Sequence, residues 1–430
     1  MDFNKKIILS VGPIVLAGLV VIASLCIPTK APVVSKEMIC QSATALDKKV
    51  YTGELVVNQA LSDPKYIPFI GASELSRFDM FHPNVLAEKY SRNYRPYLLG
   101  QSGSSLLNQY TMLNSLNNAP ASGKIVAIVA LSSFEDNDYQ NDNFVNSYSE
   151  LQTMKWLSSL EKVTEEDKIF ADNLLQMPGS IISPVFNQAL KKVSNGEKPN
   201  DFHRLVSKMK YYFDKNIETR FGVKVDDNPK HKKSKMYIYN NGIAENLNSL
   251  PDTYDEETLF KLSEKIGKKY SSNNKVGYYN PFYKMNIKNK PHKFNQMSGK
   301  YKDRYHGISK GFADFELLLS EIAERKLDAY FILPTMHPEW LKHTGLPKKS
   351  IDDLNAKLTE QLTSQGFNNI LDMNQLSGDY LMQDPLHIGW RGWMELDKAI
   401  KPFLEGPKNP NLDYQLNDKF YSDEWKNYRP

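Results

Sequence analysis

The sequence predicts an α/β protein, in which helices cover a parallel sheet, and two observations support this fold class. Short, continuously apolar runs bounded by turn-forming residues recur along the chain, as in strands that are buried on both faces. Amphipathic helical stretches separate the later runs. Because a strand, a helix and a strand of these lengths form a crossover unit, the strands are expected to run parallel.

Four apolar runs are expected to form the strands. The clearest is 124–131, KIVAIVAL, which is rich in β-branched residues after its first position. A second run, YIPFI over 66–70, ends at Gly71. The other two runs are 327–333 and 369–372.

Two helices are expected beside the later strands. The segment 311–325 carries its apolar residues on one helical stripe. The next helix is expected to begin at Ser350, where Asp353 completes a capping box, and to close at Gly366.

The regular alternation stops between the second and third runs. Helices are expected at about 148–160 and 164–175, and the polar, Tyr-rich remainder indicates a largely helical insertion at about 140–310. The expected organisation is a cytoplasmic tip and membrane anchor over 1–30, a polar stalk over 31–63 and an extracytoplasmic domain over 64–430.

One segment is apolar enough to cross a membrane. Residues Ile7–Ile27 contain no charge over 21 positions, which is about the length that spans a bilayer. Lys5 and Lys6 precede it, so the N-terminus is expected inside and the rest outside. The alternative is a cleaved signal peptide, but the bulky residues 25–28 make a poor cleavage site.

The composition is that of a globular protein with an uneven charge. The 430 residues are 41% hydrophobic and 24% charged, and a mean hydropathy of −0.51 excludes a polytopic membrane protein. Two cysteines exclude a disulfide scaffold. Between 230 and 310 there are 17 Lys or Arg against 7 Asp or Glu, a net charge of +10 in a chain of net +4.

This basic region indicates either a solvated surface or contact with a polyanion. On an exported domain the polyanion would be a teichoic acid or an anionic membrane surface, and nucleic acid is not expected. The candidate contact residues are Lys232, Lys233, Lys235, Lys268 and Lys269.

Ser73 follows the first predicted strand after a small-residue turn. That position lies at the carboxyl edge of a parallel sheet, where α/β proteins bind ligands. The alternative is a serine that only caps a helix.

Asp384 and His387 provide the second part of a candidate site. Residues three apart can hydrogen-bond across a turn, and a carboxylate then orients the imidazole that takes a proton from a serine. An early serine and a late Asp-x-x-His are the arrangement of SGNH/GDSL hydrolases.

The resemblance to one family is closer. The chain resembles the DltD family of membrane-anchored proteins of teichoic acid D-alanylation in the segments GASELSRFD (71–79), His82-Pro83, LPT (333–335) and DPLHIGWRGW (384–393). The resemblance implies an SGNH/flavodoxin-like sheet, with Ser73 as nucleophile, His387 as general base and acid, and Asp384 as its orienting partner.

The expected oxyanion hole departs from the SGNH pattern. The candidates are the backbone at Ala72, Gly103 (with Gly100 as a competitor) and Ser133, because no Gly-x-Asn follows the next strand. A structural or substrate-contacting role is expected for His82. His337 and His343 are candidates to line the cleft. No metal-ligand spacing or Gly-rich phosphate loop is present, so no cofactor is expected.

The resemblance implies an extracytoplasmic serine acyltransferase of a Gram-positive type envelope. It would carry D-alanine on Ser73 to a polyglycerol-phosphate hydroxyl of lipoteichoic acid. Its partners would be a multispanning membrane acyltransferase and the D-alanyl carrier system. Two alternatives stay open, an exported esterase of acylated wall polymers and a non-catalytic scaffold.

Overall fold

The computed structural model describes residues 13, 15–21, 23–76, 78–134, 142–177, 183–221, 247–272, 274–303 and 307–430. Within them a five-stranded sheet has the order β2-β1-β3-β4-β5, with every pairing parallel. Doubly wound flavodoxin-like sheets share this order. The strands are β1 (Tyr66–Gly71), β2 (Arg95–Gly100), β3 (Lys124–Ile128), β4 (Asp328–Leu333) and β5 (Ile370–Asp372).

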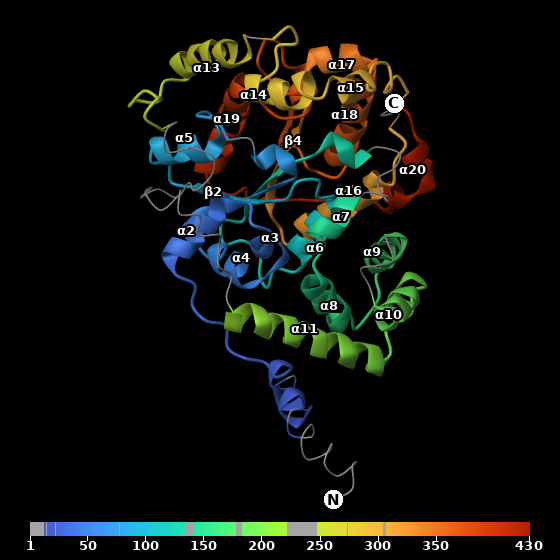
Figure 1. The fold of residues 1–430 in the computed structure, drawn as a ribbon. Coiled ribbons are helices and arrows are strands. Elements are labelled where there is room, and N and C mark those ends of the chain that lie inside the picture. The colour runs from blue at the N-terminus through green and yellow to red at the C-terminus, as the bar shows by residue number, and fades with distance from the viewer. Residues whose placement is uncertain are drawn as a thin grey trace, which may run out of the picture.

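Helices cover both faces of the sheet (Figure 1). One face packs against α2 (Lys36–Ala45), α3 (Lys48–Thr52), α4 (Leu55–Ala60), α6 (Leu106–Asn114), α16 (Gly311–Glu324) and α18 (Lys348–Thr363). The other face packs against α5 (Pro83–Lys89) and α19 (Trp390–Glu405), and α13 (Glu256–Ser271) lies against α19.

Alternation along each strand builds these two cores. In β1, Ile67 and Phe69 belong to the core under α5 and α19, whereas Tyr66 and Ile70 belong to the core on the opposite face. Both sets are apolar, which is why β1 reads as one continuous hydrophobic run.

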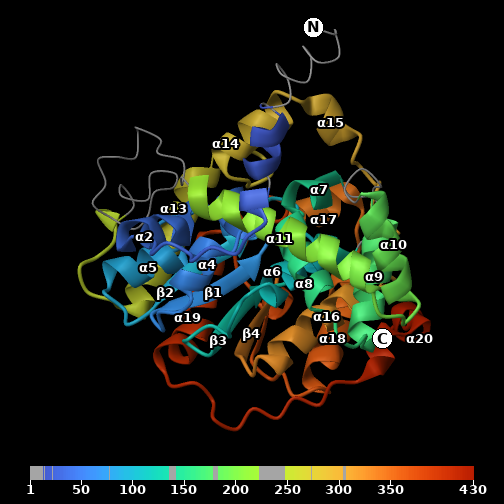
Figure 2. The same ribbon diagram turned by 90° about the horizontal axis from the view of Figure 1, so that it is seen from below.

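The long connection between β3 and β4 divides into two parts on opposite sides of the molecule (Figure 1). Its first part packs around a third core (Figure 2) and comprises α7 (Asp142–Ser147), α8 (Glu150–Ser159), α9 (Glu165–Gln176), α10 (Pro184–Ser194) and α11 (Asp201–Phe221). The second part holds α13, α14 (Asn280–Tyr283) and α15 (Pro291–Asn295), near α17 (Pro338–Thr344), which follows β4. The short α20 (Asp423–Asn427) lies near the C-terminus.

The four expected strands are confirmed, and so are the helices expected near 148–160, 164–175 and 311–325. The expected start of α18 was wrong. This helix begins at Lys348 after Pro347, without a side-chain cap, so Ser350 lies inside its first turn. Pro347 is the N-cap residue, with a φ of −64° and a ψ of 135°, and the fixed φ of proline fits this extended conformation.

The segment expected as a polar stalk is folded from Lys36 onward. The helices α2 to α4 bury Val50, Val56 and Ala60 in the core of the domain. The apolar residues of this segment are divided among three short helices. Each helix is too short to show a clear helical period in the sequence.

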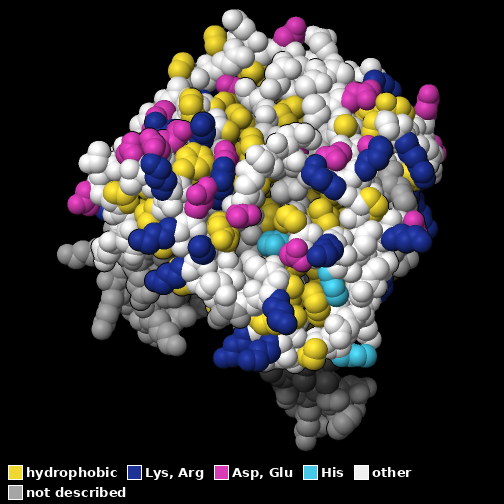
Figure 3. Space-filling view, turned by 90° about the horizontal axis from the view of Figure 1, so that it is seen from above, with side chains coloured by type: hydrophobic (Ala, Val, Ile, Leu, Met, Phe, Trp, Pro, Cys, Tyr) yellow, Lys and Arg dark blue, Asp and Glu magenta, His cyan; other side chains and the backbone are white. Residues whose placement is uncertain are grey.

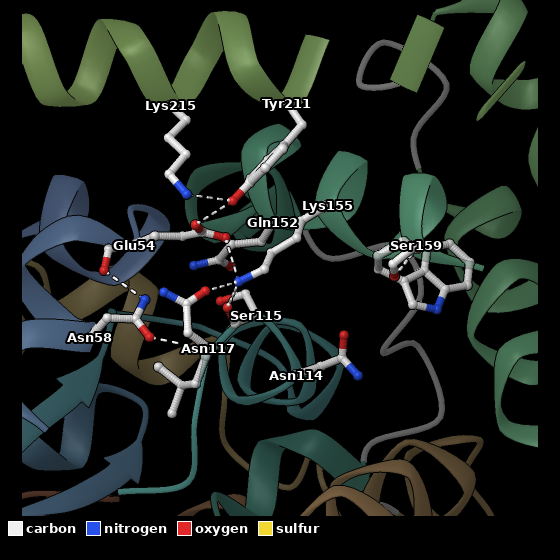
Figure 4. Close-up of polar contacts among 12 residues, drawn as sticks. Glu54, Asn58, Asn114, Ser115, Asn117, Gln152, Lys155, Ser159, Tyr211 and Lys215 are labelled. Carbon is white, nitrogen blue, oxygen red and sulfur yellow. Dashed lines mark hydrogen bonds and ion pairs between the residues drawn. The ribbon is translucent and has the colours of Figure 1, made fainter. Parts of the chain in front are cut away.

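Glu54 ties these helices to the insertion (Figure 4). Its Oε2 accepts a hydrogen bond from the hydroxyl of Tyr211 on α11 at 3.1 Å, and its Oε1 lies 3.2 Å from Nζ of Lys155 on α8. Lys215 Nζ donates to the same Tyr211 hydroxyl at 2.9 Å. Glu54 and Tyr211 are buried and the two lysines are partly buried, so the network helps to hold the N-terminal helices against α8 and α11.

The predicted membrane anchor lies partly outside the described residues, which omit 1–12, 14 and 22. Residues 15–21 are helical and exposed. Among the residues that the structure describes, no helix is both long and apolar enough to cross a membrane.

Candidate active site

Ser73 stands at the carboxyl end of β1, at the start of a 3₁₀ turn over Ser73–Ser76. It does not cap an α-helix, since the next helix, α5, begins at Pro83 with His82 as its N-cap. The strands β1 and β2 approach each other closely beside Ser73. Gly100 pairs with Gly71, and a Cβ at Gly100 would lie 2.6 Å from the Gly71 carbonyl oxygen. Gly100 is therefore a glycine required by strand packing.

The segment carrying Asp384 and His387 is a closed turn in front of α19. The backbone N–H of Gln383 donates to the His387 carbonyl at 2.9 Å, and Met382 forms an antiparallel bridge with Ile388. The two glycines of the sequence motif permit this turn to lie on the helix. A Cβ at Gly389 would lie 2.7 Å from the Tyr380 carbonyl oxygen, and one at Gly392 would lie 2.2 Å from that of Leu381.

Three side chains meet where this turn faces the end of β1. His387 Nδ1 lies 2.7 Å from Oδ1 of Asp384, and His387 Nε2 lies 3.1 Å from Oγ of Ser73. The side chain of Asp384 is 3% exposed and that of His387 is 12% exposed, while Ser73 is half-buried. A carboxylate, an imidazole and a serine hydroxyl in this order can activate the hydroxyl as a nucleophile.

Glu74 is a further residue of the site that the sequence analysis missed. Its side chain is buried beside Ser73, and its Oε2 accepts a hydrogen bond from the backbone N–H of Ala72 at 3.2 Å. Burial raises the pKa of this carboxyl, and the charges of His387 and Asp384 act on it in opposite directions. A buried carboxyl next to the candidate nucleophile makes Glu74 a candidate functional residue as well.

The three expected oxyanion donors have different surroundings. The N–H of Ala72 is bonded to Glu74, and the N–H of Ser133 donates to the Ala130 carbonyl at 3.0 Å. Gly103 has a φ of +73° in the loop after β2. Since β2 and β3 flank β1, Gly103 and Ser133 lie on either side of the Ser73 strand at the carboxyl edge.

A cavity of about 690 Å³ opens beside the closed turn that carries Asp384 and His387, at the ends of β4 and β5. It is lined by Met382, two residues before Asp384, and by His337. Its charged lining residues are of both signs, namely Lys268, Lys275, Lys348, Glu339 and Asp379. Figure 3 looks onto this side of the molecule, where hydrophobic and histidine side chains occupy the middle, and Lys and Arg lie around them with Asp and Glu interspersed.

The predicted polyanion-binding lysines are thus only partly located. Lys268 lines the cavity, whereas Lys269 extends over the ring of Tyr270, with its Nζ 5.3 Å from the ring centroid. Lys232, Lys233 and Lys235 lie outside the described residues.

The three other histidines considered in the sequence analysis make contacts with aromatic rings. His82 is buried, its ring centroid 4.7 Å from that of Trp393, and burial lowers its pKa to about 3. Burial also lowers the pKa of His337 to about 4, and His343 stacks on Phe294. His82 and His337 are therefore neutral at physiological pH, and neither can serve as a cation there.

Comparison with known proteins places this site in a family. A family model described as DltD protein matches residues 43–405, from within α2 to the end of α19. The chain belongs to the DltD family. The matched DltD region contains the β1 turn with its serine as well as the closed turn before α19.

Individual DltD proteins are similar over nearly their full length. The protein DltD of Lacticaseibacillus rhamnosus is 32% identical over 419 residues, which cover 96% of this chain and 95% of the relative. That of Bacillus subtilis is 29% identical over 407 residues, covering 92% and 97%. That of Staphylococcus aureus is 24% identical over 410 residues, covering 94% and 98%.

Proposed function

We propose that this DltD-family chain is an extracytoplasmic serine acyltransferase of teichoic acid D-alanylation, with an SGNH-type site. The observation that carries the proposal is the line of contacts from Asp384 through His387 to Ser73. The lysine-lined cavity beside that line supports an anionic acceptor. D-Alanylation as the reaction comes from the family, which the motifs around Ser73 and His387 resemble.

The reaction has two acyl transfers. Ser73 Oγ attacks the carbonyl carbon of a D-alanyl ester or thioester while His387 Nε2 takes the hydroxyl proton, and His387 then gives that proton to the leaving oxygen or sulfur. A hydroxyl of polyglycerol phosphate next attacks the D-alanyl-Ser73 ester, with His387 taking its proton. When the tetrahedral intermediate collapses, that proton passes to Ser73 Oγ, which restores the enzyme. Asp384 holds the imidazole and stabilises its charged form.

Glu74 provides a reason for selecting a D-alanyl group. The donor carries an α-ammonium next to the carbonyl that Ser73 attacks, and Glu74 is the neighbouring carboxyl. Burial raises the pKa of the Glu74 carboxyl because its negative charge is poorly solvated there, and an ammonium paired with the carboxylate would offset that cost. A neutral acyl group would gain nothing from this residue.

The acceptor would bind through its phosphates. The cavity whose lining reaches Met382 holds Lys268, Lys275 and Lys348, which could pair with these phosphates beside the carboxylates of Glu339 and Asp379. Contacts between exposed lysines and phosphate weaken with salt, so transfer to polymer should fall as ionic strength rises. Transfer to a small acceptor alcohol without phosphates should depend less on ionic strength.

Anchoring at the membrane completes the proposal. The apolar N-terminal segment would hold the chain as a single-pass protein with its N-terminus in the cytoplasm and the catalytic domain outside. A multispanning acyltransferase and the D-alanyl carrier system would supply the acyl group on that side.

Intact-mass spectrometry of the full chain in detergent, after incubation with an activated D-alanyl ester, tests the nucleophile. The expected result is a single D-alanyl adduct that Ser73→Ala abolishes and His387→Ala slows. If Ser73→Ala acquires the same adduct, or the wild-type chain acquires none, the acyltransferase proposal fails. D-Alanylation that persists in cells carrying Ser73→Ala would support the scaffold alternative.

The products separate transfer from hydrolysis. With polyglycerol phosphate present, an acyltransferase yields alanylated polymer, and an esterase yields free alanine in its place. Loss of the adduct with free alanine as the sole product would favour the esterase.

A further inference from the structure

The helix α11 presents an apolar stripe to the outside of the molecule. Phe202, Leu205, Met209 and Ile217 are all more than a third exposed. At about 100° per residue, these positions fall on one side of the helix. The opposite side is buried against α8 through residues such as Ser207 and Tyr211. The stripe therefore has no role in holding α11 to the domain, and its exposure needs another explanation.

The N-terminal segment leaves the domain at one end of this stripe. Asn216 on α11 is buried, and its Nδ2 donates to the carbonyls of Leu25 and Ile27 at 2.6 Å each. Arg220 donates to the Ser24 carbonyl at 3.2 Å. These contacts secure the emerging chain to the last turns of α11, where Ile217 ends the stripe. Figure 1 shows α11 lying across the end of the molecule from which the N-terminal helix extends.

The emerging segment is itself apolar and uncovered. Among its described residues, six large apolar side chains are more than half exposed, namely Val15, Leu16, Leu19, Val20, Val21 and Ile27. An apolar helix that is exposed on all sides is typical of a chain entering a bilayer, whereas a protein-docking helix is apolar on one side. The stripe on α11 continues this uncovered apolar surface.

The charges beside the stripe fit phospholipid headgroups. Over Asp201–Phe221 the helix carries five Lys or Arg and three Asp or Glu. Lys208 is exposed next to Met209, and Arg220 is exposed beyond Ile217. Cations flanking a stripe of Phe, Leu and Met are the pattern of helices that lie in a membrane interface, because they pair with anionic lipids.

We propose that α11 lies in the bilayer interface, with its apolar stripe in contact with lipid, and so provides a second membrane attachment beside the N-terminal segment. Two attachments would fix the tilt of the domain relative to the membrane, whereas the N-terminal anchor alone would leave the domain free to tilt. The helices α13, α14 and α17 lie on the side of the domain opposite α11 (Figure 1), so they would face away from the bilayer. The proposal rests on the proposed membrane anchoring but not on the acyl transfer.

Photocrosslinking in vesicles tests this contact. The full chain is reconstituted into vesicles of phosphatidylcholine and phosphatidylglycerol, with p-benzoylphenylalanine in place of Phe202. The matched control carries it in place of Met285, because both residues are 61% exposed and Met285 lies in the second part of the insertion. A third variant carries it in place of Leu19, in the N-terminal segment.

The readout is the yield of phospholipid adducts on the labelled peptide. At Phe202 it should exceed the yield at Met285 by about fivefold or more, and approach the yield at Leu19. A Phe202 yield as low as that at Met285 would overturn the proposal, and adducts at Leu19 in the same experiment would leave the anchor standing. Illumination in native membranes that links position 202 to a protein in place of lipid would assign the stripe to a partner, which also overturns it. Ser73 acylation is unaffected by either result.

Discussion

Asp384 binds His387 twice through one oxygen. Its Oδ1 accepts the backbone N–H of His387 at 3.1 Å and lies 2.7 Å from Nδ1 of the imidazole ring. The same atom also accepts the N–H of Leu386 at 3.2 Å. The carboxylate thus shapes the turn and orients the ring, and with Nδ1–H donating to it, Nε2 is free to accept the proton of Ser73.

Asp384→Asn separates these two roles. The amide oxygen can still accept the backbone N–H groups, so the turn should keep its shape. The negative charge is lost, and the amide favours the wrong imidazole tautomer, so acylation of Ser73 should slow by about 10³–10⁴-fold. Intact-mass kinetics measure the rate, and thermal unfolding serves as the control for folding. Acylation at the wild-type rate would mean that Asp384 has only a structural role.

Glu74→Gln should change selectivity more than reactivity. The amide keeps an oxygen acceptor for the Ala72 N–H but cannot pair with an ammonium. We expect acylation by a D-alanyl ester to fall by about 10-fold or more, whereas acylation by the matching neutral ester, without the amino group, changes little. The ratio of the two rates, measured on the same sample, is the observable. An equal loss for both esters would assign Glu74 to the general geometry of the site.

The sequence predicted the parts of the fold that depend on local pattern. The buried parallel strands are continuous apolar runs, so β1, β3 and β4 could be recognised. The edge strand β2 could not, because its Arg95-Pro96 start interrupts the pattern. Proline is tolerated there since β2 has a neighbour on one side only.

The site, too, was predictable only where its residues follow a local pattern. Ser73, Asp384 and His387 carry a recognisable spacing and family resemblance. Glu74 lies within the resembling segment 71–79, but nothing in the sequence separates it from its neighbours there, since its burial depends on how β1, its turn and the α19 segment pack. The hydrogen bond from the Ala72 N–H to Glu74 could not be predicted for the same reason.

Arg92→Met should destabilise the fold strongly. Arg92 Nη2 donates to Oδ2 of Asp397 on α19 at 2.8 Å, and both side chains are buried. Removing the cation leaves Asp397 buried and unpaired, apart from the hydroxyl of Tyr254 at 3.2 Å. The free energy of unfolding should fall by about 3–5 kcal/mol, as urea unfolding in detergent can measure.

The double variant Arg92→Met with Asp397→Leu is the matched control. It removes both charges, so it should be more stable than Arg92→Met alone. A double variant as unstable as the single one would show that lost packing, and not the unpaired charge, causes the effect.

Glu316 should make stability depend on pH in an unusual direction. It is buried on α16, and its Oε2 accepts hydrogen bonds from Nε2 of Gln361 and of Gln365 at 2.9 Å each. Burial is the main cause that raises the pKa of this carboxyl from 4.5 to about 7. Because the folded pKa lies above the unfolded one, the folded state binds the proton more tightly. Its contribution to stability is therefore complete below about pH 4.5 and is lost as the pH rises through 7.

Glu316→Gln replaces the protonated acid by a permanently neutral amide. The loss of stability at rising pH should therefore disappear in this variant. Between pH 4.5 and 8 the wild-type chain should lose up to about 3 kcal/mol of unfolding free energy through this group, and the variant should not. Urea unfolding at both pH values gives the difference. Glu424→Gln, at an exposed position of α20, should follow the wild-type pH dependence. If Glu316→Gln follows it as well, the carboxyl is already ionised in the folded protein, and its charge must be held by the two glutamine amides alone.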